Sequence, residues 1–140
     1  MQISRKRGVR RRESGRGLVE AVTAAFILIP IAFFLLDVTV LILASTMNDT
    51  AVKNAARAAA NQEDGGAAFQ AANKSLENFK SSSIIKSLDL TKFDYPGSKT
   101  SVTCETTIVV NVPIPVPGYD DIKFTARAVE PIVGVKNDQL

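Results

Sequence analysis

The sequence has no histidine and only one cysteine, Cys104, among its 140 residues. Without histidine, the chain can build neither a histidine-based metal site nor a catalytic triad that uses histidine as its base. A lone cysteine excludes a disulfide bond within the chain and leaves the redox compartment undecided. The adjacent Asp120 and Asp121 supply too few oxygen ligands for calcium, so no metal site is expected. Because the sequence also lacks a phosphate-binding loop and a paired nucleophile and base, we expect a protein that is not an enzyme and needs no cofactor.

Charge is nearly absent from a long stretch in the first half of the chain. Between Ala21 and Met47 the only ionisable side chain is Asp37. As a helix, with about 1.5 Å per residue, this stretch extends roughly 40 Å, which is enough to cross a bilayer with some tilt. The run therefore predicts a transmembrane segment at about 21–47. A cleaved signal peptide is the alternative, although its apolar region is usually only about 7–15 residues long.

The positive charge of the chain is concentrated before that stretch. Residues 1–16 carry seven Lys or Arg against one acidic residue, whereas from Asn48 onward 10 Lys or Arg face 11 Asp or Glu, a net charge of −1. Basic residues beside a membrane helix resist translocation. The block that includes Arg10, Arg11 and Arg12 therefore predicts a single-pass topology with a cytoplasmic N-terminus. Its position at the tip of the chain argues against a nucleic-acid partner.

The helix is expected to continue beyond the membrane, because residues 47–60 are rich in strong helix formers and contain neither glycine nor proline. We predict one long helix over 16–64, ended by Gly65 and Gly66. Pro30 lies inside this helix and predicts a kink, since proline removes a backbone hydrogen bond.

The remaining residues, 65–140, are predicted to form a small head domain. An amphipathic helix is expected from Ala67 to about Lys80. Its apolar stripe toward the core consists of Phe69, Ala72, Leu76 and Phe79. The following segment, from Ile84 to Leu90, is compatible with either a helical tail or a first strand.

Strong alternation of apolar and polar residues then predicts a half-buried strand from Ser101 to Val112, with Cys104 on its inward face as a small buried hydrophobe. A further strand is expected from Ile122 to about Val129. The prolines between these strands exclude a central strand and predict an edge or a crossing loop. Because an isolated hairpin is marginal in water, two or three antiparallel strands must pack on the helices, which makes the predicted fold class α+β.

The junction between the basic block and the apolar run has a specific pattern, in which Gly15 is followed at the fifth position by Glu20. The chain then continues with a proline-containing apolar helix, an alanine-rich extension and the stretches VVNVPIPVPG and TARAVEP. This order resembles the TadE-like pseudopilins, which are minor pilins of bacterial tight-adherence pili. The resemblance implies that a prepilin peptidase cuts between Gly15 and Arg16. Residues 1–15 would be a basic leader, and Glu20 would become the fifth residue of the mature subunit.

The same resemblance implies where the protein acts and with which partners. It implies a single-pass protein of the bacterial inner membrane, with a cytoplasmic N-terminus and a periplasmic head, that enters a surface pilus used in adhesion or secretion. The expected partners are major and minor pilin subunits, the prepilin peptidase, the inner-membrane assembly platform and the lipid bilayer. Two alternatives stay open. One is an uncleaved membrane anchor that presents a periplasmic interaction domain, and the other is a pseudopilin of a type II secretion system.

Two acidic residues are candidates for assembly contacts. Cleavage would create an α-amino cation at Arg16, about one helical turn from Glu20, and a carboxylate at the membrane face is unfavourable unless it is paired. Glu20 is therefore expected to neutralise that amine on a neighbouring subunit, unless it only faces headgroups. Asp37, whose insertion costs about 2.5–3.5 kcal/mol at a helix centre, is expected to face another pilin or the assembly platform. The alternative for Asp37 is that the membrane span ends near Leu36.

Overall fold

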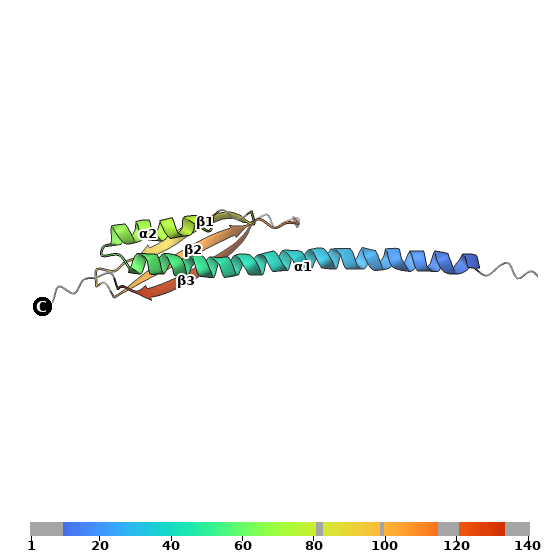
Figure 1. Ribbon diagram of the computed structural model, residues 1–140, viewed down its shortest axis with the longest axis horizontal. Coiled ribbons are helices and arrows are strands. Elements are labelled where there is room, and N and C mark those ends of the chain that lie inside the picture. Colours follow the sequence, from blue (N-terminus) through green and yellow to red (C-terminus); the bar gives the residue numbers. More distant parts are fainter. Residues whose placement is uncertain (1–9, 81–82, 99, 115–120, 134–140) are drawn as a thin grey trace, which may run out of the picture. The chain divides into compact units, whose positions relative to one another are not determined.

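The structure is a computed structural model that describes residues 10–80, 83–98, 100–114 and 121–133, with residues 10–14 described in their backbone alone. Within these residues it has two helices and three strands (Figure 1): α1 (Arg10–Ala60), α2 (Gly65–Glu77), β1 (Ile85–Asp94), β2 (Ser101–Val110) and β3 (Ile122–Pro131). This arrangement confirms the predicted α+β fold class. By its internal contacts the chain divides into two units, Met1–Leu36 and Asp37–Leu140.

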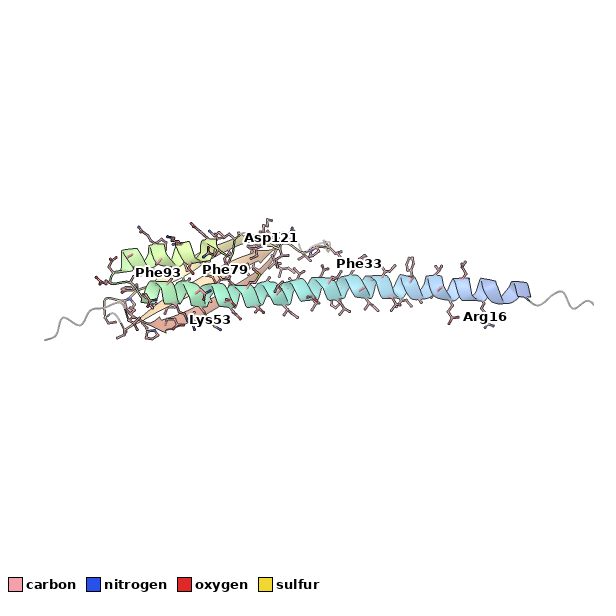
Figure 2. All side chains as sticks on the ribbon, in the orientation of Figure 1. Arg16, Phe33, Lys53, Phe79, Phe93 and Asp121 are labelled. Atoms are coloured by element: carbon pink, nitrogen blue, oxygen red, sulfur yellow. The ribbon has the colours of Figure 1, made fainter. Side chains whose placement is uncertain are left out.

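In the first unit, α1 exposes its side chains on every side. Each residue from Gly15 to Leu36 is exposed to the surroundings. The side chains of Arg16 and Phe33, for example, project outward from the helix (Figure 2). Among the described residues, α1 is the one helix that is long and apolar enough to cross a membrane, and none of its most apolar stretch is buried.

Pro30 lies inside α1, and the helix continues through it to Ala60. Proline has no N–H, so the carbonyl of Phe26, four residues earlier, lacks its usual helical donor. The kink inferred from the sequence stays a prediction.

In the second unit, one face of α1 covers a sheet. Burial begins after Leu36 and recurs every three or four residues, which is the period of one helix face. The buried positions are mostly alanines: Ala44, Asn48, Ala51, Val52, Ala55, Ala56, Ala59 and Ala60. Because alanine fills little volume, most of the large buried side chains come from the strands and α2.

The strands form an antiparallel sheet in the order β1-β2-β3. The alternation predicted for β2 is confirmed, because every inward side chain of this central strand is 0% exposed: Val102, Cys104, Thr106, Ile108 and Val110. β1 shows that the ambiguous segment is a strand. Its pairing with β2 shifts register between Ile85 and Ser87 and between Leu90 and Lys92, whereas β2 and β3 pair in continuous register. These shifts interrupt the period of two by which a strand is recognised in a sequence.

The connection between the helices differs from the prediction that Gly65 and Gly66 end the long helix. α1 ends at Ala60, and both glycines belong to the first turn of α2. The side chain of Asp64 caps α2 by accepting a hydrogen bond from the Ala67 N–H at 2.8 Å. The N–H of Val133 donates to the Ala60 carbonyl at 2.9 Å and satisfies one of the acceptors that the end of α1 leaves free. The prediction was wrong because a cap and a tertiary bond, rather than the glycines, set these ends.

The buried face of α2 also differs from the prediction at its first residue, which is Ala68 and not Phe69. Ala68, Ala72 and Leu76 are buried, whereas Phe69 is 48% exposed. The ring of Phe69 instead meets the ring of Phe93 edge to face, with centroids 5.4 Å apart. The small Ala68, which is 0% exposed, takes the core position in place of the aromatic ring, which lies at the border of the core.

A buried polar pair fixes α1 on the sheet. The hydroxyl of Thr106, on β2, donates to Oδ1 of Asn48 at 2.8 Å. Nδ2 of Asn48 donates in turn to the carbonyl of Phe124, on β3, at 3.0 Å. Both side chains are almost fully buried, so any shift of the helix along the sheet would leave polar atoms without partners. The pair therefore sets the register of α1 against β2 and β3.

Thr106→Val should lower the free energy of unfolding by about 1–3 kcal/mol, because it leaves the buried Oδ1 of Asn48 without a donor. Thr107→Val is the matched control, since the Thr107 hydroxyl lies on the opposite face at 3.2 Å from that of Thr125 and is exposed. The control should change stability by less than about 0.5 kcal/mol. Urea unfolding of the detergent-solubilised chain, monitored by the alkylation of Cys104, measures the stability of both variants. Equal effects would contradict the register role.

Candidate functional site

The predicted cleavage junction lies within α1 and is fully exposed from Gly15 to Glu20. A side-chain carbon built on Gly15 or on Gly17 would meet nothing within 4 Å, so packing requires glycine at neither position. Each glycine weakens a helix by about 1 kcal/mol relative to alanine. Two of them in one turn make this part of α1 easier to unwind than the apolar part that follows.

The basic residues before the junction enter the structure only in part. The backbone of Arg10, Arg11 and Arg12 is helical at the start of α1. Their side chains lie outside the described residues, as do residues 1–9 altogether. The topology inferred from these charges stays a prediction.

Glu20 is exposed on α1 and forms no ion pair with any residue whose side chain is described. Arg16, one helical turn earlier, is also exposed and does not reach it. The carboxylate is therefore accessible to a cation from outside the chain. Its predicted partner, the α-amine of another subunit, is not tested by a single chain.

Asp37 has a partner within its own unit. Its Oδ1 accepts a hydrogen bond from the backbone N–H of Ile114 at 3.3 Å, across 77 positions of sequence. The residue is half-buried and follows directly after Leu36, where the fully exposed part of α1 ends. Sequence reasoning expected at Asp37 either a second protein or the end of the membrane span near Leu36. No sequence signal could reveal a backbone amide so far along the chain.

Cys104 lies on the inner face of β2 and is 0% exposed, which confirms the prediction of a small buried hydrophobe. Burial raises the pKa of its thiol from 9.0 to about 11, because the low-polarity core disfavours the thiolate. The thiol is thus a poor nucleophile and a poor metal ligand at neutral pH.

In the part of the chain that the structure describes, no cluster of acidic, cysteine or histidine side chains could hold a metal ion. Asp120, one of the two carboxylates considered for calcium, lies outside the described residues. Its neighbour Asp121 pairs with Lys86, with Oδ1 at 2.7 Å from Nζ.

The contacts that hold α1 in the head were missed by sequence reasoning. Besides Asn48, they include an exposed ion pair at 3.3 Å between Arg57 and Glu130. For Asn48 a signal exists, since it is a polar residue on a helix face otherwise made of alanine and valine. No sequence signal predicts the ion pair between Arg57 and Glu130, because a charged residue on an exposed face has many candidate partners.

No family model, curated protein or solved structure matches the chain. The resemblance to TadE-like pseudopilins therefore rests on the junction residues and the order of elements. What the described residues offer is a set of surfaces: an exposed apolar helix, an accessible carboxylate near its start, and a second carboxylate bound to the head at Asp37.

At pH 8 or below, iodoacetamide should alkylate Cys104 of the native chain about 100-fold more slowly than that of the urea-unfolded chain, from the pKa difference alone. Protection from the reagent would slow it further. The rate should rise steeply only as the pH approaches 11. The exposed variant Asn61→Cys provides the control, because its added thiol should react as fast as a free thiol. Equal rates at the two cysteines would contradict the buried state of Cys104.

Proposed function

We propose that this chain is a TadE-like minor pilin or pseudopilin: a structural subunit that a prepilin peptidase cleaves after Gly15 and that takes part in assembling a tight-adherence pilus. The observation that carries the proposal is the change in α1 between Leu36 and Asp37. Before it, every described side chain from Gly15 is exposed and most are large and apolar. After it, one helix face is the alanine-rich cover of a sheet. A pilin subunit lies in the membrane before assembly and packs against neighbouring helices after it. It therefore needs an exposed apolar part of the helix that is separate from the part that covers its own sheet.

The exposed apolar part has the length of a membrane span. From Leu18 to Leu36 it extends roughly 28 Å as a helix, close to the hydrocarbon thickness of about 30 Å. Ala44 and Asn48 belong to the head core and are closed to lipid. These two facts favour a span that ends near Leu36, with the N-terminus in the cytoplasm and the head in the periplasm.

The junction fits a peptidase substrate. A scissile bond must leave the helix and lie extended in a protease site, and the unpacked Gly15 and Gly17 reduce the cost of that unwinding. After cleavage, the cation at Arg16 and the carboxylate of Glu20 would stand about one turn apart. In the low-polarity surroundings of packed helices, pairing between subunits would stabilise both charges and set the axial register.

Gly15→Leu should block processing in cells that have an active prepilin peptidase, because the bulky side chain obstructs the scissile bond. Gly17→Leu is the matched control: it is equally unpacked, so both variants should insert and fold alike. N-terminal sequencing and intact mass of the membrane-extracted protein should show a chain that begins at Arg16 for wild type and control. A full-length wild-type chain under these conditions would refute cleavage and leave the uncleaved anchor as the function.

Glu20→Ala should insert and be cleaved normally but be incorporated into pili at least about tenfold less, since a loss of roughly 1.4 kcal/mol per contact corresponds to that factor. Glu77→Ala, which removes an exposed carboxylate from α2, serves as the control. Immunoblots of sheared pili and of membranes measure the partition. Wild-type incorporation of Glu20→Ala would contradict the pairing. Recovery of the chain with a type II secretion pseudopilus would place it in that related class.

A further inference from the structure

The geometry points to a second membrane contact: the end of the head domain beside Asp37 rests among the lipid headgroups. This inference rests on the proposed function in one respect, because it requires α1 to cross a bilayer. It adds a lipid-binding surface made of the end of the sheet together with the uncovered side of α1 just after Leu36.

The first step is the contact of Ile114 with Asp37. The N–H of Ile114 lies 3.3 Å from Oδ1 of Asp37, the residue that directly follows the membrane-length stretch. Whatever the angle at which the helix crosses the bilayer, this bond keeps the end of the sheet close to the point where the chain leaves it.

The second step is the composition of that end. The register aligns Ile85, Val110 and Ile122 in one row across the three strands. Beyond this row the sheet end continues with Asn111, whose N–H donates to the Ile84 carbonyl at 2.9 Å. The apolar residues that gather there and remain half-buried or exposed are Ile84, Val112, Pro113, Ile114 and Ile122.

Two of the charged side chains at this end pair with each other. Lys86 and Asp121 form an ion pair at 2.7 Å, and Figure 2 shows Asp121 at the end of the sheet. The carboxylate of Asp37 receives the Ile114 amide. An ion pair, or a carboxylate that accepts a hydrogen bond, costs less to move into a less polar layer than a charge without a partner.

The third step is the exposure of α1 itself. Ile42 and Leu43 lie inside the head unit, yet they are 63% and 51% exposed, on the side of the helix that the sheet leaves uncovered. They follow Asp37 by five and six residues, or about 8–9 Å along the helix axis. On a helix that leaves the hydrocarbon near Leu36, they lie at the outer part of the headgroup layer, which is about 5–8 Å thick on each side.

Lipid is the occupant that these observations favour over a second copy of the chain. The surface follows in sequence, along the same helix, the exposed apolar stretch Leu18–Leu36 that the proposed function places in the bilayer. It combines apolar side chains with paired charges, as interfacial surfaces do. A contact between copies needs no such proximity to the end of the span.

The test uses the full-length chain in vesicles of phosphatidylethanolamine and phosphatidylglycerol. An environment-sensitive thiol probe is placed at Pro113→Cys, while the native Cys104 stays unlabelled because it is buried. Asn61→Cys is the matched control, exposed and about 35 Å farther along the helix axis. Leu28→Cys reports on the span. Lipids that carry a nitroxide either at the headgroup or in mid-chain quench each probe according to its depth.

We expect headgroup nitroxides to quench the probe at Pro113 several-fold more than the probe at Asn61, and mid-chain nitroxides to quench the probe at Leu28. Asn111→Cys, also exposed and at the same end, should behave like Pro113→Cys and guards against a local effect of replacing the proline.

If Leu28 is quenched but neither Pro113 nor Asn111 is, the inference is wrong while the membrane span stands. If Leu28 escapes mid-chain quenching, the span itself fails, and the inference with it. Shielding of Pro113 from a water-soluble quencher that grows with the protein-to-lipid ratio, without quenching by lipid, would assign the surface to a second copy and overturn the inference.

Discussion

The burial of the alanine face of α1 against the inner face of β2 holds the head domain together. A small sheet with one apolar face must bury that face against another element. Here the described cover comes from the second part of α1 and from α2, which share one core cluster with the strands. The helix therefore cannot leave the sheet without unfolding the head. Small alanine side chains interdigitate little with the sheet, so packing alone would define the position of α1 along its axis poorly. The hydrogen bond between Asn48 and Thr106 fixes that position.

The same helix meets two environments, and its side chains change accordingly. Up to Leu36 it carries phenylalanine, leucine and isoleucine, all exposed, which suits a solvent of acyl chains or the helices of neighbouring subunits. From Ala44 its covered face is small, which suits close contact with a sheet. Asp37 stands between these regions. Its bond to the Ile114 amide gives a carboxylate at the edge of the apolar stretch a partner that no other subunit needs to provide.

The sequence predicted the parts of the fold in which burial has a regular period. The alternation of β2 is complete because one face of this central strand is buried and the other is accessible to solvent. The long helix follows from residues with a strong helical preference. β1 stayed ambiguous because its two register shifts break the alternation. The interhelical turn was misplaced because a glycine pair can begin a helix as well as end one, and Asp64 was the cue that would have decided between them.

Some features of the candidate site could likewise be predicted from the sequence, and others could not. The accessibility of Gly15 and Glu20 follows from their place at the margin of an apolar run. The partner of Asp37 and the partners of Asn48 could not be found, since a backbone amide carries no sequence signature and long-range pairing depends on the closed fold.

Several tertiary bonds of α1 come from the end of the chain. Phe124, Glu130 and Val133 bind Asn48, Arg57 and Ala60 respectively, and all three follow the β1–β2 hairpin in sequence. Contacts between distant parts of a chain form late, after the loop between them has closed. During synthesis the alanine face is thus made first, and its cover stays incomplete until the last strand leaves the ribosome. The nascent chain consequently has an incomplete head after the whole of its N-terminal helix has been made.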